Sequence, residues 1–155
     1  MTHFASPVRF ETGKADEQDI LVHLQDYDQF FVPLLSEKVN LAEYARKLFD
    51  KAVTFEAWFE GELVGLIAGY FNNTADGIGF ITNVSVSPAQ KGTGIVARLM
   101  QNCIDYALLK GFSTISLEVS AQNVPAIQLY KKFGFTEQSR KGDSLTMNIS
   151  LERST

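Results

Sequence analysis

Apolar residues along this chain recur with two spacings, one typical of helices and one typical of strands. Spacing of three or four residues predicts helices at 16–33, 41–49, 95–108 and 124–133. Pro33 is expected to stop the first of these helices, and Gly134 follows the last. Apolar runs between turn residues predict strands at 8–12, 54–59, 63–71, 80–86, 114–119, 135–139 and 145–151.

These elements follow one another in the order β-α-α-β-β-β-α-β-α-β-β. The order predicts an α/β fold built on an α+β mixed sheet, and residues 1–155 show no repeat, linker or low-complexity tract. The length and the hydrophobic content of 45% suit one domain with a real core. The net charge of −4 argues against a nucleic-acid partner, because a duplex binder needs a basic surface.

Several functional classes are unexpected on composition. The single cysteine, Cys103, occupies an apolar helical position, which favours core packing over a nucleophilic role. Histidines and cysteines are too few to predict a metal site. The chain lacks an apolar run of membrane-spanning length and an apolar signal core. We therefore expect a cytoplasmic protein with no membrane partner, acting as a monomer or a homodimer.

A turn rich in glycine joins the predicted strand 80–86 to the next helix. Gly92 and Gly94 carry no Cβ, and amides at a helix start have no intrahelical partner. Such amides, with the helix dipole, form a site suited to phosphate. The local pattern equally allows glycines that only turn the chain.

A second strand-to-helix segment ends this ambiguity. Its residues fit the pattern N-x-x-A-x-x-L-Y-x-x-x-G-F, as Asn123, Ala126, Leu129, Tyr130, Gly134 and Phe135. The two segments together resemble the GNAT superfamily of acetyl-CoA-dependent N-acetyltransferases. The first fits the family's turn Arg/Gln-x-x-Gly-x-Gly/Ala with two departures, Lys91 for Arg or Gln and Val96 for the second Gly or Ala. The specific motifs cover about the C-terminal half of the chain.

The resemblance implies a GNAT-like fold with acetyl-CoA as co-substrate and no metal. The diphosphate of acetyl-CoA is then expected on the turn formed by Lys91, Gly92, Thr93, Gly94, Ile95 and Val96. The strand carrying Val84 and Val86 is expected to splay from the strand at Thr114 and bind the pantetheine arm. Asn123 caps its helix and is expected to touch the co-substrate as well.

Two residues carry the chemistry that the resemblance implies. Tyr130 stands where the family has a general acid, although a tyrosine on a helix can also be a core aromatic. Glu118 interrupts an apolar strand, and burial of a carboxylate is costly unless it is paired or functional. Leu117-Glu118-Val119 resembles the ribosomal-protein alanine acetyltransferases, in which this glutamate is the base. A solvent-facing Glu118, or a water relay in its place, remains an alternative.

The acceptor is expected to be a small-molecule amine, such as an amino sugar or an amino-acid derivative. Its pocket is expected to involve Phe30, Phe31, Tyr44, Phe71 and Asn83. A protein N-terminal amine is the alternative acceptor. A non-catalytic acyl-CoA-binding module is a further alternative, which the presence of Tyr130 disfavours.

Overall fold

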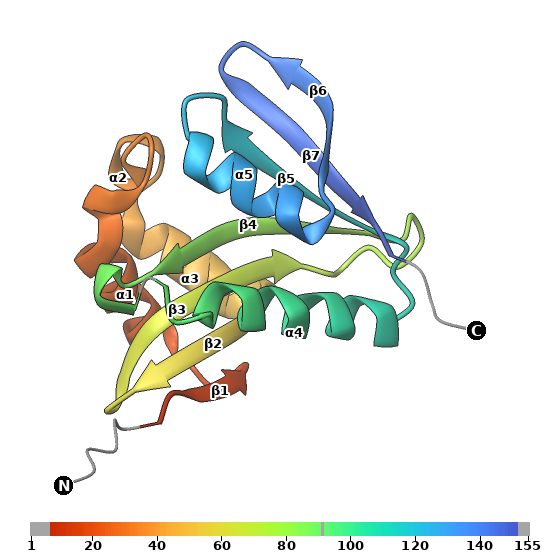
Figure 1. The fold of residues 1–155 in the computed structure, drawn as a ribbon. Helices are drawn as coiled ribbons and strands as arrows, with labels where there is room; N and C mark the ends of the chain where they lie inside the picture. The colour runs from red at the N-terminus through yellow and green to blue at the C-terminus, as the bar shows by residue number, and fades with distance from the viewer. Residues whose placement is uncertain (1–6, 91, 152–155) are drawn as a thin grey trace, which may run out of the picture.

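The computed structural model describes residues 7–90 and 92–151, which build one seven-stranded sheet covered by helices (Figure 1). The strands are β1 (Arg9–Thr12), β2 (Val53–Phe59), β3 (Glu62–Tyr70), β4 (Ile78–Val86), β5 (Thr114–Ser120), β6 (Thr136–Lys141) and β7 (Ser144–Ser150). Their order in the sheet is β1-β2-β3-β4-β5-β7-β6. Only β4 and β5 pair in parallel among the described strands, so the predicted mixed sheet is confirmed.

The helical elements match the predicted order except around the first helix. They are α1 (Glu17–Tyr27), η1 (Asp28–Phe30), α2 (Leu35–Lys38), α3 (Leu41–Lys51), η2 (Pro88–Gln90), α4 (Ile95–Leu109) and α5 (Val124–Phe133). The prediction that the first helix runs to Pro33 is wrong. Helix α1 ends at Tyr27, the turn η1 follows it, and Phe31 is already extended before Pro33 is reached. The Asp28 carboxylate instead accepts hydrogen bonds from the Ser36 amide and hydroxyl, at 2.7 and 2.6 Å, and folds the segment back.

Each face of the sheet carries its own apolar core. Helices α4 and α5 cover one face, and α1 and α3 cover the other (Figure 1). The α4 side is packed by buried residues that include Leu99, Met100 and Cys103, and burial raises the pKa of the Cys103 thiol to about 12. This placement confirms Cys103 as a core residue. The α1–α3 side is packed by Ile20, Leu24, Leu48 and Leu66.

A buried carboxylate ties the start of α1 to the sheet. Glu56 on β2 is fully buried and accepts hydrogen bonds from the Lys14 and Ala15 amides, at 3.0 to 3.2 Å. Its oxygens also accept from Thr54 Oγ1 at 2.5 Å and from Trp58 Nε1 at 3.0 Å. Because every one of these contacts is a donor, the site needs a group that only accepts.

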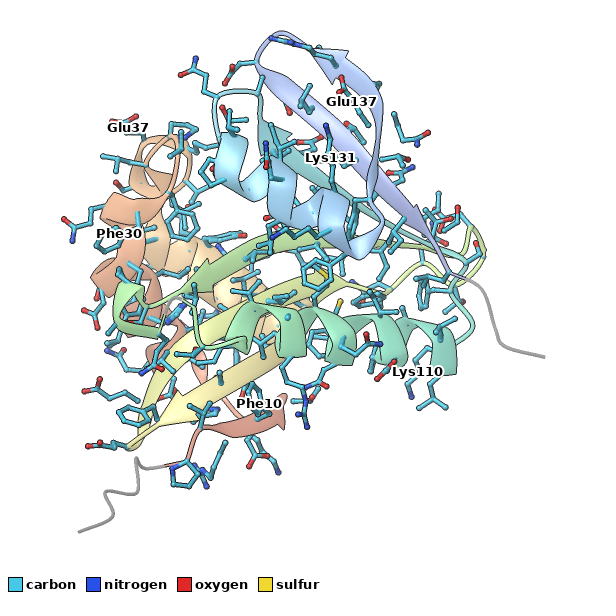
Figure 2. All side chains as sticks on the ribbon, in the orientation of Figure 1. Phe10, Phe30, Glu37, Lys110, Lys131 and Glu137 are labelled. Atoms are coloured by element: carbon cyan, nitrogen blue, oxygen red, sulfur yellow. The ribbon has the colours of Figure 1, made fainter. Side chains whose placement is uncertain are left out.

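Replacing Glu56 by glutamine is therefore expected to destabilise the fold. The amide would aim N–H groups at donors, and an unsatisfied buried group costs roughly 1–3 kcal/mol. For a chain of this length each kcal/mol shifts the melting temperature by roughly 2–4 °C, so the melting temperature should fall by about 2–12 °C. Thermal melts check this, with the exposed Glu137→Gln on β6 as matched control (Figure 2). A Glu56→Gln melt within 1 °C of the wild type would contradict the assignment.

Candidate functional site

Strands β4 and β5 are hydrogen-bonded to each other along only about half of their length. Their parallel pairing runs from Ile78↔Thr114 to Ile81↔Leu117 and stops there, although β4 continues to Val86 and β5 to Ser120. A bulge marks the same place, because β3 pairs Gly69 with Ile81 but Ala68 with Asn83. The expected splay of these strands is thus confirmed, and it opens a wedge in the sheet.

A cavity of about 280 Å³ fills this wedge and reaches the loop that follows α1. Its walls come from both halves of the chain: Tyr27, Phe30, Phe31, Val32, Pro33, Leu35, Lys38, Thr82, Asn83, Val84, Ser85, Val86, Val96, Glu118, Val119, Ser120, Asn123, Ala126, Leu129 and Tyr130. The residues singled out from the sequence that meet here are Phe30, Phe31, Asn83, Val84, Val86, Val96, Glu118, Asn123 and Tyr130. The wedge therefore joins most of the predicted site.

Two residues expected to contact the acceptor lie outside the cavity wall. Phe71 is 7% exposed, and its ring packs edge-on against Tyr106 and Phe112 in the α4-side core. Phe71, which directly follows β3, therefore lies in this core and not on the cavity wall. Tyr44 lies behind the wall, where its hydroxyl contacts the carbonyl oxygen and the hydroxyl of Thr82, at 3.0 and 2.8 Å. Tyr44 therefore supports the wall without forming it.

The glycine turn leads directly into α4 beside the wedge. Gly92 and Gly94 adopt φ of +80° and +82°, and no heavy atom lies within 4 Å of a Cβ built on either. The first helical hydrogen bond runs from the Arg98 amide to the Gly94 carbonyl at 3.0 Å. The amides between them, from Ile95 on, therefore have no intrahelical acceptor. Thr93 bonds back to the Gln90 carbonyl, and Lys91 lies outside the described residues.

Glu118 on β5 lines the cavity in the wedge, and its carboxylate is accessible to solvent. It is exposed, whereas Leu117 and Val119 on either side are buried on the opposite face of β5. No residue in 7–90 or 92–151 forms an ion pair or hydrogen bond with its carboxylate. Glu118 thus faces solvent, as one of the two interpretations of the sequence expected, and it also lines the cavity.

Tyr130 presents a protonated phenol to the same cavity. Its ring is 8% exposed and packs against Phe135, with 5.9 Å between ring centroids. Burial raises the pKa of Tyr130 to about 12, so the phenol keeps its proton throughout the neutral range. Nothing in the described chain bonds to its hydroxyl, which leaves that proton available to a ligand. Asn123 caps the same helix through the Ala126 amide at 3.4 Å, as predicted.

Sequence reasoning missed a buried polar contact at the floor of the cavity. His23 on α1 places Nδ1 2.9 Å from the Leu63 carbonyl oxygen and Nε2 2.8 Å from Ser85 Oγ. Ser85 Oγ also lies 2.9 Å from Asn83 Oδ1. The one signal in the sequence was a histidine on the apolar stripe of α1, between Ile20 and Leu24.

The described residues hold neither a metal-binding cluster nor a membrane-spanning helix. No three side chains among His, Cys, Asp and Glu gather there in a way that could hold a metal ion. No helix in this part of the chain is both long and apolar enough to cross a bilayer.

Comparison with known proteins places this geometry in a family. Residues 19–135 match the sequence model of the acetyltransferase (GNAT) family. Streptothricin acetyltransferase of Escherichia coli is 33% identical over 87 residues, which are 56% of this chain and 49% of that protein. The chain thus spans about half the length of this curated relative.

Two of the solved structures that share this fold illustrate the likeness. The ribosomal-protein-S18-alanine N-acetyltransferase of Escherichia coli superimposes with a TM-score of 0.76 at 18% identity, over 96% of this chain and 97% of that one. The PaiA N-acetyltransferase of Thermoplasma acidophilum, solved in complex with coenzyme A, gives 0.72 at 18% identity, over 92% and 99%. At these identities the likeness shows the fold alone.

Proposed function

This chain belongs to the GNAT family of acetyltransferases, and we propose that it transfers an acetyl group from acetyl-CoA directly to the amine of a small molecule. The observation that carries the proposal is the wedge between β4 and β5. It brings Tyr130, Glu118 and Asn83 to one cavity beside the start of α4.

Acetyl-CoA, the acetyl donor of this family, fits the open features around the wedge. The amides at the start of α4 suit its diphosphate, and Gly92 and Gly94 leave space for close approach. The edge of β4 that turns away from β5, at Val84 and Val86, offers backbone groups to the pantetheine amides. Asn123 lines the same cavity and completes this proposed binding surface.

In this proposal Glu118 and Tyr130, which both line the cavity, each carry out one of two proton transfers. Glu118 takes a proton from the acceptor amine, because a carboxylate open to the cavity can accept one. Tyr130 gives its proton to the departing thiolate, since its phenol stays protonated at neutral pH. The two groups act on opposite ends of the same transfer.

The acceptor class follows from the apolar and charged groups of the cavity. Phe30 and Phe31 supply aromatic surface, and Phe30 lies at the outer edge of the α1–α2 side (Figure 2). Lys38 and Glu118 bring one charge of each sign to the wall. This pairing suits an amine that also bears an anionic group, so an amino-acid derivative fits better than an amino sugar.

A protein α-amine is the second candidate acceptor. Glu118 between Leu117 and Val119 favours it, because this triplet resembles the ribosomal-protein alanine acetyltransferases. A thiol-release assay with acetyl-CoA against amino-acid derivatives, amino sugars and peptides with free N-termini separates the candidates. Turnover with small amines supports the proposal, whereas turnover with peptides alone supports the second candidate. Tight acetyl-CoA binding with no acceptor at all would indicate a binding module.

Replacing Gly94 by aspartate is expected to weaken acetyl-CoA binding. The new carboxylate would stand where the diphosphate is proposed to lie, and like charges repel there. We expect Kd to rise at least ~10-fold, or about 1.4 kcal/mol, by titration calorimetry.

Gly142→Asp is the matched control for this change. Gly142 has φ +59° and an equally open surrounding, but it lies in the β6–β7 turn. Unchanged affinity in a folded Gly94→Asp protein would remove the turn from the binding site.

A further inference from the structure

A buried histidine on α1 reaches the wedge cavity through a serine of β4. His23 is 2% exposed and bonds Leu63 on one side and Ser85 on the other. Ser85 lines the cavity, as does its neighbour Asn83. The contacts thus form a continuous path from the cavity to a ring that can hold a proton.

This path has one hydrogen fewer than its contacts need for every contact to be a hydrogen bond. The Leu63 carbonyl can only accept, so Nδ1 of His23 carries the hydrogen of the neutral ring, and Nε2 is bare. The single hydroxyl hydrogen of Ser85 then faces two acceptors, His23 Nε2 at 2.8 Å and Asn83 Oδ1 at 2.9 Å. One added proton on His23 satisfies both bonds, because Nε2 then donates to Ser85 and Ser85 donates to Asn83.

The reaction supplies such a proton. A protonated amine gives up two protons when it becomes an amide: one before it attacks, and one as the C–N bond forms. In the proposed mechanism Glu118 takes the first. The second is released at the nitrogen, inside the cavity, where Ser85 is the lining residue that is bonded to a buried base.

On the basis of the proposed function, we infer that Ser85 and His23 form a proton relay for the acceptor amine. As the C–N bond forms and the C–S bond breaks, the N–H proton passes to Ser85 Oγ. The hydroxyl proton of Ser85 passes at the same time to His23 Nε2, and the thiolate takes the Tyr130 proton. After the product leaves, the imidazolium returns its proton through Ser85 to water, Glu118 releases its proton and Tyr130 regains one, so that one net proton leaves the site for each acetyl group transferred.

The surroundings of His23 make it a transient acceptor. Burial lowers its pKa to about 4, so the ring is neutral between turnovers and gives a proton back readily. Tyr27 packs on the ring edge-on at 4.9 Å between centroids, and Asp26 on the same helix favours the charged form. Asp19 of α1 and Glu62 of β3 line a second, smaller cavity with His23, and they add negative charge nearby.

Kinetics with the identified acceptor test the relay. His23→Gln keeps an oxygen to accept from Ser85 and an N–H to donate, but it cannot take up a proton. We expect kcat/KM for the amine to fall ~10²-fold at neutral pH, with Kd for acetyl-CoA unchanged. Ser85→Ala should lose as much, and Ser85→Thr should retain most activity. Ser116→Ala on β5, outside the cavity wall, is the matched control.

A rate series in mixtures of H₂O and D₂O separates proton transfer from a structural role. The relay protons and the Tyr130 proton moving together give a strongly curved dependence in the wild type, and His23→Gln, which loses the relay but keeps the Tyr130 transfer, should give a clearly weaker curvature. A linear wild-type series, or a His23→Gln rate within threefold of the wild type, would overturn the relay while leaving acetyl transfer intact.

A second measurement needs no acceptor. ¹⁵N NMR of the imidazole at pH 7 should show His23 as the Nδ1–H form with Nε2 unprotonated. An Nε2–H ring would overturn the inference, because it could not accept the Ser85 proton. If no amine in the screen causes release of coenzyme A thiol, the proposed function fails, and the relay fails with it. If acetyl transfer is found but the ring carries its hydrogen on Nε2, only the relay is rejected.

Discussion

Tyr130→Phe is expected to lower kcat by ~10²-fold or more, while Kd for acetyl-CoA changes little. The substitution removes one hydroxyl and keeps the ring that packs against Phe135. Without the phenol, the thiolate must leave unprotonated or wait for a proton from water. Steady-state kinetics with the identified acceptor, together with calorimetric titration of acetyl-CoA, measure both quantities.

The pH dependence of the wild type gives an independent check on this acid. Because burial raises the pKa of Tyr130 to about 12, activity should not decline through loss of the phenol proton until well above neutral pH. Tyr106→Phe, on α4 against Phe55 and Phe71, is the matched control and should leave turnover unchanged. Turnover near the wild-type value in a folded Tyr130→Phe protein would refute the assignment.

Glu118→Gln is expected to reduce turnover by ~10²–10⁴-fold at neutral pH. The amide fills the same space on β5 but cannot accept a proton from the amine. The deficit should shrink as pH rises, since free amine then accumulates without a base. Rates across a pH series, paired with acetyl-CoA affinity, check this expectation.

The pattern across pH separates the possible outcomes for Glu118. An equal deficit at every pH would indicate that Glu118 positions the acceptor, and no deficit would remove it from the mechanism. Glu60→Gln, an exposed glutamate in the β2–β3 turn, should behave as the wild type. A double variant with His23→Gln should lose more than either single change, because the two groups serve different protons.

The site was predictable where it is built from short segments. Asn123 and Tyr130 lie on one helix, and their spacing alone places them on one face. The alternation of apolar residues in β5 likewise set Glu118 apart from Leu117 and Val119. Such features depend on local geometry, which the order of residues determines directly.

Features that depend on contacts between distant segments were not predictable. The buried His23 has its hydrogen-bond partner in Ser85, 62 residues away in the sequence, and no local pattern links the two residues. Phe71 shares its aromatic character with Phe30 and Phe31, but the strand β3 carries it into the opposite core. Helix α2 has four residues, too few for a period of 3.6 to be visible.

The open wedge also presents an unpaired strand edge to other polypeptides. Beyond Ile81, β4 is paired with β3 on one side and presents a bare strand edge on the other. Bare edges invite a foreign strand to add to the sheet, and proteins counter this with bulges and charges. The bulge at Thr82 and the carboxylate of Glu118 stand at this gap. The same carboxylate that is proposed to draw in an amine thus discourages the addition of another polypeptide.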